Sequence, residues 1–190
     1  MKEHPIIFKG EMVRAILEGR KTMTRRPVKW PLKVIPHSED IHDPNGIYIQ
    51  WKGFPEFGLI RPKWKIGDQL WVKETFVANN LTSIFWYRAD GGPPYPKDDW
   101  DNRWQPSIFM PRYASRITLE VINIRVERVQ EITEEDALKE GIVPLQMDQG
   151  DPRPRFEGLW DSIYGIGAWE RNDWIWAIEF KLITGAGKGK

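Results

Sequence analysis

The clearest pattern in the chain is an alternation of apolar and polar residues over 117–129, which is typical of a long β-strand with one buried face. Shorter apolar runs between turn residues predict further strands at 6–8, 47–49, 69–76, 84–88 and 174–182. In the run that starts at position 69, the alternation places Leu70, Val72 and Glu74 on one face. A carboxylate on an otherwise apolar face needs a partner, and the cations of 20–26 are the natural candidates.

Three short segments show the spacing of helices instead. The first covers 11–18 and ends at Gly19, a residue suited to helix termination. The second follows Thr133, whose hydroxyl and the acids after it suit a helix N-terminus, and it stops at Gly141. The third covers 156–164, where the apolar side chains fall on one helical face.

Strands separated by turns, with three short helices, predict an α+β fold built as a compact β-barrel with helical additions. The chain has 190 residues, so we expect a single domain over 1–184 followed by a flexible tail at 185–190. Its 11 Trp and 15 Pro indicate short strands and long, ordered loops, because proline interrupts regular structure and large rings need burial or stacking partners.

Charge and composition exclude several classes of function. Lys and Arg number 28 against 27 Asp and Glu, and a net charge of +1 means that any basic site must be local. The chain has no cysteine, which excludes disulfides and thiolate metal sites and fits a reducing compartment. No signal peptide or spanning helix is predicted, and the His and acidic residues of 37–43 match no closed metal site. We therefore predict no membrane contact, no metal and no cofactor.

The densest candidate chemistry lies in the segment 19–27, Gly-Arg-Lys-Thr-Met-Thr-Arg-Arg-Pro. A hydroxyl beside an amine can act as a nucleophile beside its base, and guanidinium groups suit planar anions. Its Pro27 confines an extended path to the edge of a sheet. Residues three apart in an ideal strand face opposite sides, so Lys21 and Thr24 would converge only across a bulge or turn. A solvated edge strand is the alternative interpretation.

The order of these features resembles the ASCH domain family, whose β-barrel is related to the PUA-like fold. The likeness rests on Gly-Arg-Lys-Thr-x-Thr-x-Arg at 19–26 after a helix, then Gly-Asp-x-Leu at 67–70 with Glu74, a long strand, a short acidic helix and a Trp-rich final strand. The runs 110–116 and 172–176 resemble a larger, phage-associated branch. That branch implies a location in the cytoplasm of a bacterium or of a phage-infected host. The segments exceeding the minimal domain are then insertions at about 29–65, 77–107 and 143–155.

The resemblance implies an activity. Small bacterial members of the family hydrolyse the amide of N(4)-acetylcytidine with a Lys, a Thr and a Glu. Their Lys and Thr correspond to Lys21 and Thr24, and matching Leu-Thr-Glu to 132–134 puts their Glu at Glu140. Glu74 is the other candidate acid, although a structural pair with an arginine is the commoner role for such a residue. The residues expected to contact the ligand are Arg20, Arg25, Arg26, Glu74 and Trp71.

Two further functions stay open. The first is a non-catalytic module that binds RNA or single-stranded nucleic acid in a cleft lined by Lys21, Arg25, Arg26 and aromatic rings, with affinity that falls with salt. The second is an accessory protein that binds a protein partner through its Trp- and Pro-rich loops. The near-zero net charge favours a small ligand over a long polyanion. The pattern predicts no particular oligomeric state.

Overall fold

The computed structural model describes residues 1–29, 41–43, 46–50, 57–78, 84–93, 103–144 and 150–185. Its helices are α1 (Gly10–Leu17), α2 (Glu134–Lys139) and α3 (Arg153–Tyr164), and its 3-10 turns include η1 (Arg88–Asp90), η3 (Ser107–Phe109), η4 (Arg112–Ala114) and η5 (Val129–Glu131). Its strands are β1 (Glu3–Ile7), β2 (Met23–Pro27), β3 (Ile41–Asp43), β4 (Gly46–Gln50), β5 (Phe57–Ile60), β6 (Gln69–Lys73), β7 (Phe76–Ala78), β8 (Phe85–Tyr87), β9 (Ile117–Arg128) and β10 (Trp174–Gly185). The predicted α+β class is confirmed.

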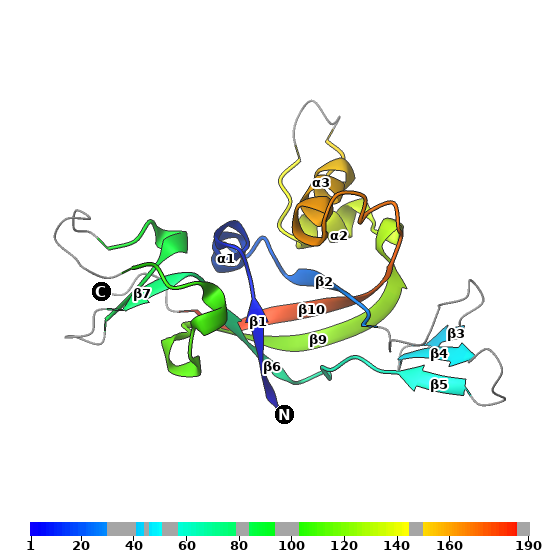
Figure 1. Ribbon diagram of the computed structural model, residues 1–190, viewed down its shortest axis with the longest axis horizontal. Helices are drawn as coiled ribbons and strands as arrows, with labels where there is room; N and C mark the ends of the chain where they lie inside the picture. The colour runs from blue at the N-terminus through cyan, green and yellow to red at the C-terminus, as the bar shows by residue number, and fades with distance from the viewer. Residues whose placement is uncertain are drawn as a thin grey trace. The chain divides into compact units, whose positions relative to one another are not determined.

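The strands form three sheets (Figure 1). The main sheet has five strands in the order β1-β6-β9-β10-β2, with β1 parallel to β6 and the β6-β9 and β10-β2 pairs antiparallel. The strands β3, β4 and β5 form a second sheet, and β7 pairs with β8. Within the described residues the order ends at β1 on one side and at β2 on the other, so the predicted closed barrel does not form there.

The chain divides into two compact units. Unit 1 comprises Met1–Thr22, Gly67–Val121 and Phe180–Lys190, and unit 2 comprises Met23–Ile66 and Ile122–Glu179. The strands β9 and β10 each contribute residues to both units. The predicted single domain over 1–184 with three insertions stays a prediction, and parts of each insertion (30–40, 44–45, 51–56, 79–83, 94–102 and 145–149) lie outside the described residues.

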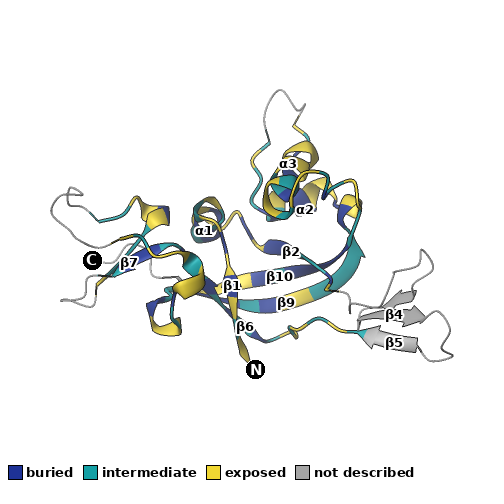
Figure 2. Cartoon of the chain, in the orientation of Figure 1, coloured by how far each residue is buried: buried dark blue, intermediate teal, exposed yellow. Residues whose placement is uncertain are grey.

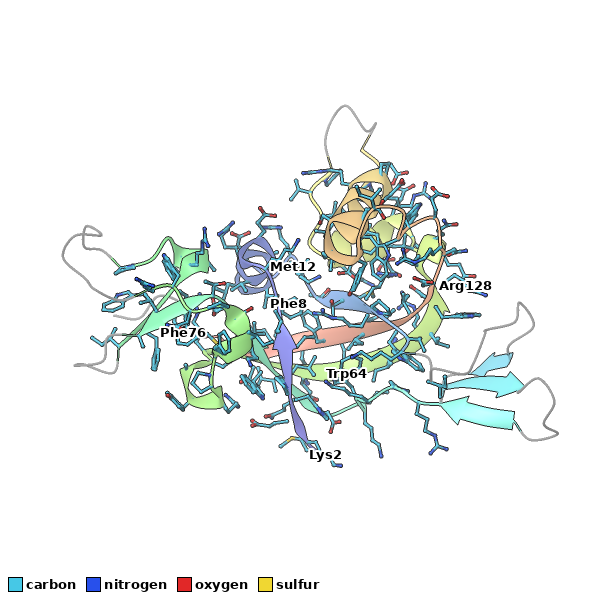
Figure 3. The ribbon with its side chains drawn as sticks, in the orientation of Figure 1. Lys2, Phe8, Met12, Trp64, Phe76 and Arg128 are labelled. Atoms are coloured by element: carbon cyan, nitrogen blue, oxygen red, sulfur yellow. The ribbon has the colours of Figure 1, made fainter. Side chains whose placement is uncertain are left out.

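The core of unit 1 follows from the alternation in β6. Leu70 and Val72 are fully buried, as is Glu74 just after the strand, so the predicted inward face is confirmed. Helix α1 adds a buried face of its own and ends before Gly19, which has a φ of +74° that glycine adopts without steric cost. The ring of Phe8, labelled in Figure 3, lies 6.2 Å from that of Phe180.

The core of unit 2 lies where α2 and α3 pack beside β2 and β10. Helix α2 begins as predicted, with the hydroxyl of Thr133 accepting the backbone N–H of Asp136 at 3.1 Å. Figure 2 shows buried residues along much of β2 and β10 and on parts of both helices. The apolar residues of this cluster are Met23, Val129, Ile132, Ala137, Phe156, Trp160, Ala168, Ile175 and Ala177.

Several element boundaries differ from the sequence predictions. The predicted strand 69–76 is divided, because β6 ends at Lys73 and the backbone of Phe76 pairs with Gln105 through hydrogen bonds of 2.7 and 3.2 Å. The strands β3 and β5 were not predicted, since only 47–49 showed a strand pattern between 29 and 65. Strand β10 reaches Gly185, the first residue of the predicted tail, and residues 186–190 lie outside the described part.

Candidate functional site

The segment that carries the predicted chemistry starts at the end of α1. The backbone N–H groups of Arg20 and Lys21 both donate to the carbonyl of Ala15, at 2.9 and 3.0 Å. The side chain of Lys21 is buried, and its Nζ lies 5.6 Å from the centre of the Phe8 ring. A lysine this deeply buried is uncommon. The predicted solvated edge therefore does not describe this residue.

Thr24 lies in β2, where its backbone is in register with Ile178 of β10. Only 4% of its surface is exposed, so its hydroxyl faces a protected environment. Arg25, the next residue, is aligned with Ala177. Pairing with β10 along 23–27 makes β2 a regular strand. Lys21 belongs to unit 1 and Thr24 to unit 2.

Arg25 is the centre of a carboxylate cluster in unit 2. Its side chain has no exposed surface, and its Nη2 donates to Glu127 at 2.6 Å and to Asp136 at 2.7 Å. Its Nη1 reaches the Oε1 of Glu140 at 3.4 Å, and its guanidinium lies 5.7 Å from the ring centre of Phe156. Burying a guanidinium is tolerable only with such partners. The hydrogen-bonding groups of Arg25 face carboxylates of its own chain. Its contact with a ligand stays a prediction.

A second arginine borders the same cluster. Arg125 donates to Glu127 at 2.7 Å and to Glu179 at 2.8 Å, and it also pairs with Asp136. One third of its side chain is exposed, so it lies at the solvent boundary of the cluster. Burial lowers the pKa of Arg125, but its hydrogen bond to Glu127 and the charges of Glu127 and Asp136 together outweigh this, so that the pKa is raised.

Glu140 lies at the C-terminal end of α2, and its side chain is 4% exposed. Asp136 and Glu140 are four residues apart, which places both carboxylates on one face of the helix, and both contact Arg25. In the sequence, this glutamate has a predicted role only through the family resemblance. The four-residue spacing of Asp136 and Glu140 is the feature of the sequence from which a cation shared by the two acids could have been predicted.

The other two predicted arginines lie in different environments. Arg20 is exposed and pairs with Glu18 through its Nε at 2.8 Å. Arg26 is partly buried and interacts with Tyr164 of α3. Burial raises the pKa of Tyr164, and the charge of Arg26 offsets part of that rise. Of the three predicted arginines, Arg20 alone has an exposed side chain.

Glu74, the other candidate acid, is held by an arginine that sequence reasoning did not find. The Nε and Nη2 of Arg116 donate to its two oxygens at 2.9 and 3.0 Å, and Arg116 also pairs with Asp90 and lies 4.0 Å from the centre of the Tyr87 ring. The predicted partner from 20–26 is wrong, because both oxygens of Glu74 bind Arg116. Burial raises the pKa of Glu74, and the hydrogen bonds from Arg116 offset only part of that rise.

Trp71 lies on the outer face of β6, away from the buried face of that strand. Lys73 and Arg112 place their cationic groups 5.5 and 6.0 Å from its ring centre. These are cation–π distances. Trp71 therefore lies beside two cations of unit 1, the half-buried Lys73 and the exposed Arg112.

Comparison with protein-family models, with curated proteins and with solved structures gives no match. Within the described residues, no helix combines the length and the apolarity needed to cross a membrane. The chemistry of the molecule must therefore be inferred from its own buried polar groups.

Proposed function

We propose that this chain is an ASCH-type, PUA-like protein that hydrolyses the amide of an acylated cytidine-type nucleoside, with Lys21, Thr24 and Glu140 as its reactive residues. One observation carries the proposal: these three are all buried. The buried polar side chains of the described part are Lys21, Thr24, Arg25, Asp68, Glu74, Thr118, Asp136 and Glu140. Burying polar groups costs free energy, and such groups are concentrated at functional sites. The mixed α+β fold agrees with the fold class that the resemblance implies, whereas the described strands form no closed barrel.

In the proposed reaction the hydroxyl oxygen of Thr24 attacks the acyl carbon, and the amine of Lys21 accepts the hydroxyl proton. The tetrahedral intermediate then collapses, and its bond to the exocyclic nitrogen of the cytosine ring breaks. This nitrogen takes the proton from the ammonium of Lys21. The nucleoside leaves, and the acyl group remains on Thr24 as an ester. Water attacks this ester with Lys21 again as base, and the proton returns to the Thr24 oxygen as the carboxylic acid departs.

Glu140 fits the role of orienting the substrate better than Glu74 does. Both oxygens of Glu74 accept hydrogen bonds from Arg116, at 2.9 and 3.0 Å, which fixes that carboxylate in a structural pair, whereas the family resemblance puts the substrate-orienting acid at Glu140. A carboxylate can accept the N–H of the scissile amide and so fix its orientation. We therefore assign this role to Glu140 and a structural role to Glu74.

The test is incubation of the purified protein with N(4)-acetylcytidine, with cytidine release followed by chromatography. Lys21→Met and Thr24→Val keep apolar bulk and remove the reactive group, and each should abolish turnover. Thr118→Val is the matched control for Thr24→Val, because Thr118 is also a buried strand threonine. No turnover by the folded wild-type protein would rule out this substrate, and unchanged turnover in Thr24→Val would rule out the nucleophile.

A further inference from the structure

The segment that includes η3 and η4 is firmly anchored in unit 1. Met110 and Ala114 are almost completely buried, and the hydroxyl of Tyr87 donates to the carbonyl of Ala114 at 2.9 Å. The Nζ of Lys73 donates to the carbonyl of Ile108. These contacts come from β6 and β8. The segment is thus held to unit 1 at several points.

The same segment exposes large apolar side chains. Ile108 is 60%, Phe109 68% and Tyr113 80% exposed, and much of the segment is exposed in Figure 2. The ring of Tyr113 lies 5.9 Å from that of Phe85 on β8. Exposing such groups from an anchored segment is costly in water, and clusters of this kind mark interaction sites. A rigid presentation also lowers the entropy lost on binding.

Two cations of unit 1 lie close to this segment, because Lys73 donates to the carbonyl of Ile108 and Arg112 is part of η4. Lys73 and Arg112 both lie near the ring of Trp71, and Arg112 makes two hydrogen bonds to the exposed Glu3, at 2.8 and 3.0 Å. Such an exposed pair is weak and exchanges readily with another anion. We call Trp71, Lys73, Ile108, Phe109, Arg112 and Tyr113 together the aromatic–cationic face.

The charge of the two units is unequal, although the whole chain is nearly neutral. Unit 1 has fourteen Lys and Arg against ten Asp and Glu, a net charge of +4. Unit 2 has fourteen Lys and Arg against seventeen Asp and Glu, a net charge of −3. The aromatic–cationic face therefore belongs to unit 1, whose positive net charge attracts anions.

We propose that the aromatic–cationic face binds single-stranded nucleic acid, with bases stacked on Phe109 and Tyr113 and phosphates near Lys73 and Arg112. Exposed rings beside cations are the combination that binds such strands without sequence preference. A polyanion would also neutralise the positive net charge of unit 1, and an apolar protein surface would leave that charge without counter-charges. This binding does not depend on the proposed hydrolysis, because none of the reactive residues Lys21, Thr24 and Glu140 belongs to the face.

The test is fluorescence anisotropy of a labelled oligouridine RNA of about 12 nucleotides, a length within the range of such sites. The affinity should fall about fivefold to tenfold between about 50 and 200 mM salt, as expected for roughly two phosphate contacts. Phe109→Ala and Tyr113→Ala should each weaken binding at least about fivefold. Tyr113→Leu should weaken it as much as Tyr113→Ala, because leucine keeps apolar bulk but cannot stack.

Two controls in unit 2 match these changes. Ile166 is fully exposed, so Ile166→Ala removes a comparable apolar group, and Arg153 pairs with Asp151 much as Arg112 pairs with Glu3. Arg112→Gln should weaken RNA binding, whereas Arg153→Gln and Ile166→Ala should leave it unchanged. Thermal unfolding should show the same midpoint for all variants of exposed side chains.

The proposal is overturned if the wild-type protein does not bind the RNA, if the control variants lose as much affinity as the face variants, or if Phe109→Ala and Tyr113→Ala bind normally. It is also overturned if Tyr113→Leu binds as well as the wild type, because apolar bulk rather than stacking would then explain the contact. Sedimentation that shows a wild-type dimer without RNA binding, and a monomer in Phe109→Ala, would identify the face as a contact between copies.

Discussion

Among the described residues, Arg116 of unit 1 and Arg25 of unit 2 each lie among carboxylates with little exposed side chain, and the two clusters are built differently. In unit 1, Arg116 holds Glu74 with two parallel hydrogen bonds, and its second partner, Asp90, is 36% exposed. In unit 2, Arg25 is fully buried and divides its donors among three carboxylates. The first cluster is a forked pair with an outer partner, and the second is a shared cation.

The difference bears on the proposed roles of Glu74 and Glu140. A forked pair occupies both oxygens of the acid, which favours a fixed structural role for Glu74. A shared cation cannot serve three acids equally, and Glu140 has the longest contact, 3.4 Å against 2.6 Å for Glu127 and 2.7 Å for Asp136. In the proposed reaction Glu140 is the acid that orients the substrate.

The largest effect is expected from Arg25→Met. It leaves buried carboxylates without their shared cation, and breaking a buried pair typically costs about 3–5 kcal/mol. Urea unfolding should show this loss in the free energy of unfolding, with Arg153→Met at the surface as a control that changes little. Wild-type stability in Arg25→Met would contradict the description of Arg25 as the centre of the cluster.

Glu140→Gln should reduce kcat for N(4)-acetylcytidine by about 100-fold, because a misoriented amide reacts more slowly. Glu74→Gln should leave kcat within about threefold of the wild type, since its role is structural. Glu135→Gln, an exposed position on the same helix, is the matched control. If Glu74→Gln lost more activity than Glu140→Gln, the two assignments would have to be exchanged.

The pH dependence of stability should differ between Glu74→Gln and the wild type. Burial raises the pKa of Glu74 in the folded protein above 4.5, its ordinary value, so the folded state holds this proton more tightly than the unfolded state does. The wild type should therefore lose stability as pH rises from about 4.5 through the raised pKa, and the variant should lack this component. Urea unfolding at a series of pH values measures it, and parallel curves for both proteins would contradict the prediction.

Arg125→Gln should have the smallest effect, about 1 kcal/mol in the free energy of unfolding. Arg125 is one third exposed, so water and salt compensate much of its loss. Urea unfolding of Arg125→Gln and Arg25→Met under the same conditions compares how much the outer and the inner arginine of the cluster contribute to the free energy of unfolding. An equal loss of free energy of unfolding in both variants would contradict this ranking and show that the two arginines stabilise the cluster cooperatively.

Local pattern was sufficient to predict most of the secondary structure. The alternation over 117–129 became β9, the capping hydroxyl of Thr133 begins α2, and the inward face of Leu70, Val72 and Glu74 is buried as predicted. These features depend on neighbouring residues, because strand alternation and helix capping are decided within a few positions. The end of β6 at Lys73 was missed, since it depends on pairing with a distant segment.

The sequence by itself determined which residues are chemically unusual: a lysine, a threonine and two glutamates that the motif pattern selected and that are buried in the fold. Only the tertiary structure decided their partners. Arg25 meets Glu127, Asp136 and Glu140 at sequence separations of 102, 111 and 115 residues, and Arg116 meets Glu74 across 42. No local periodicity encodes such pairs, because the choice among many possible counter-charges is made by the packing of strands and helices that brings one of them within hydrogen-bonding distance.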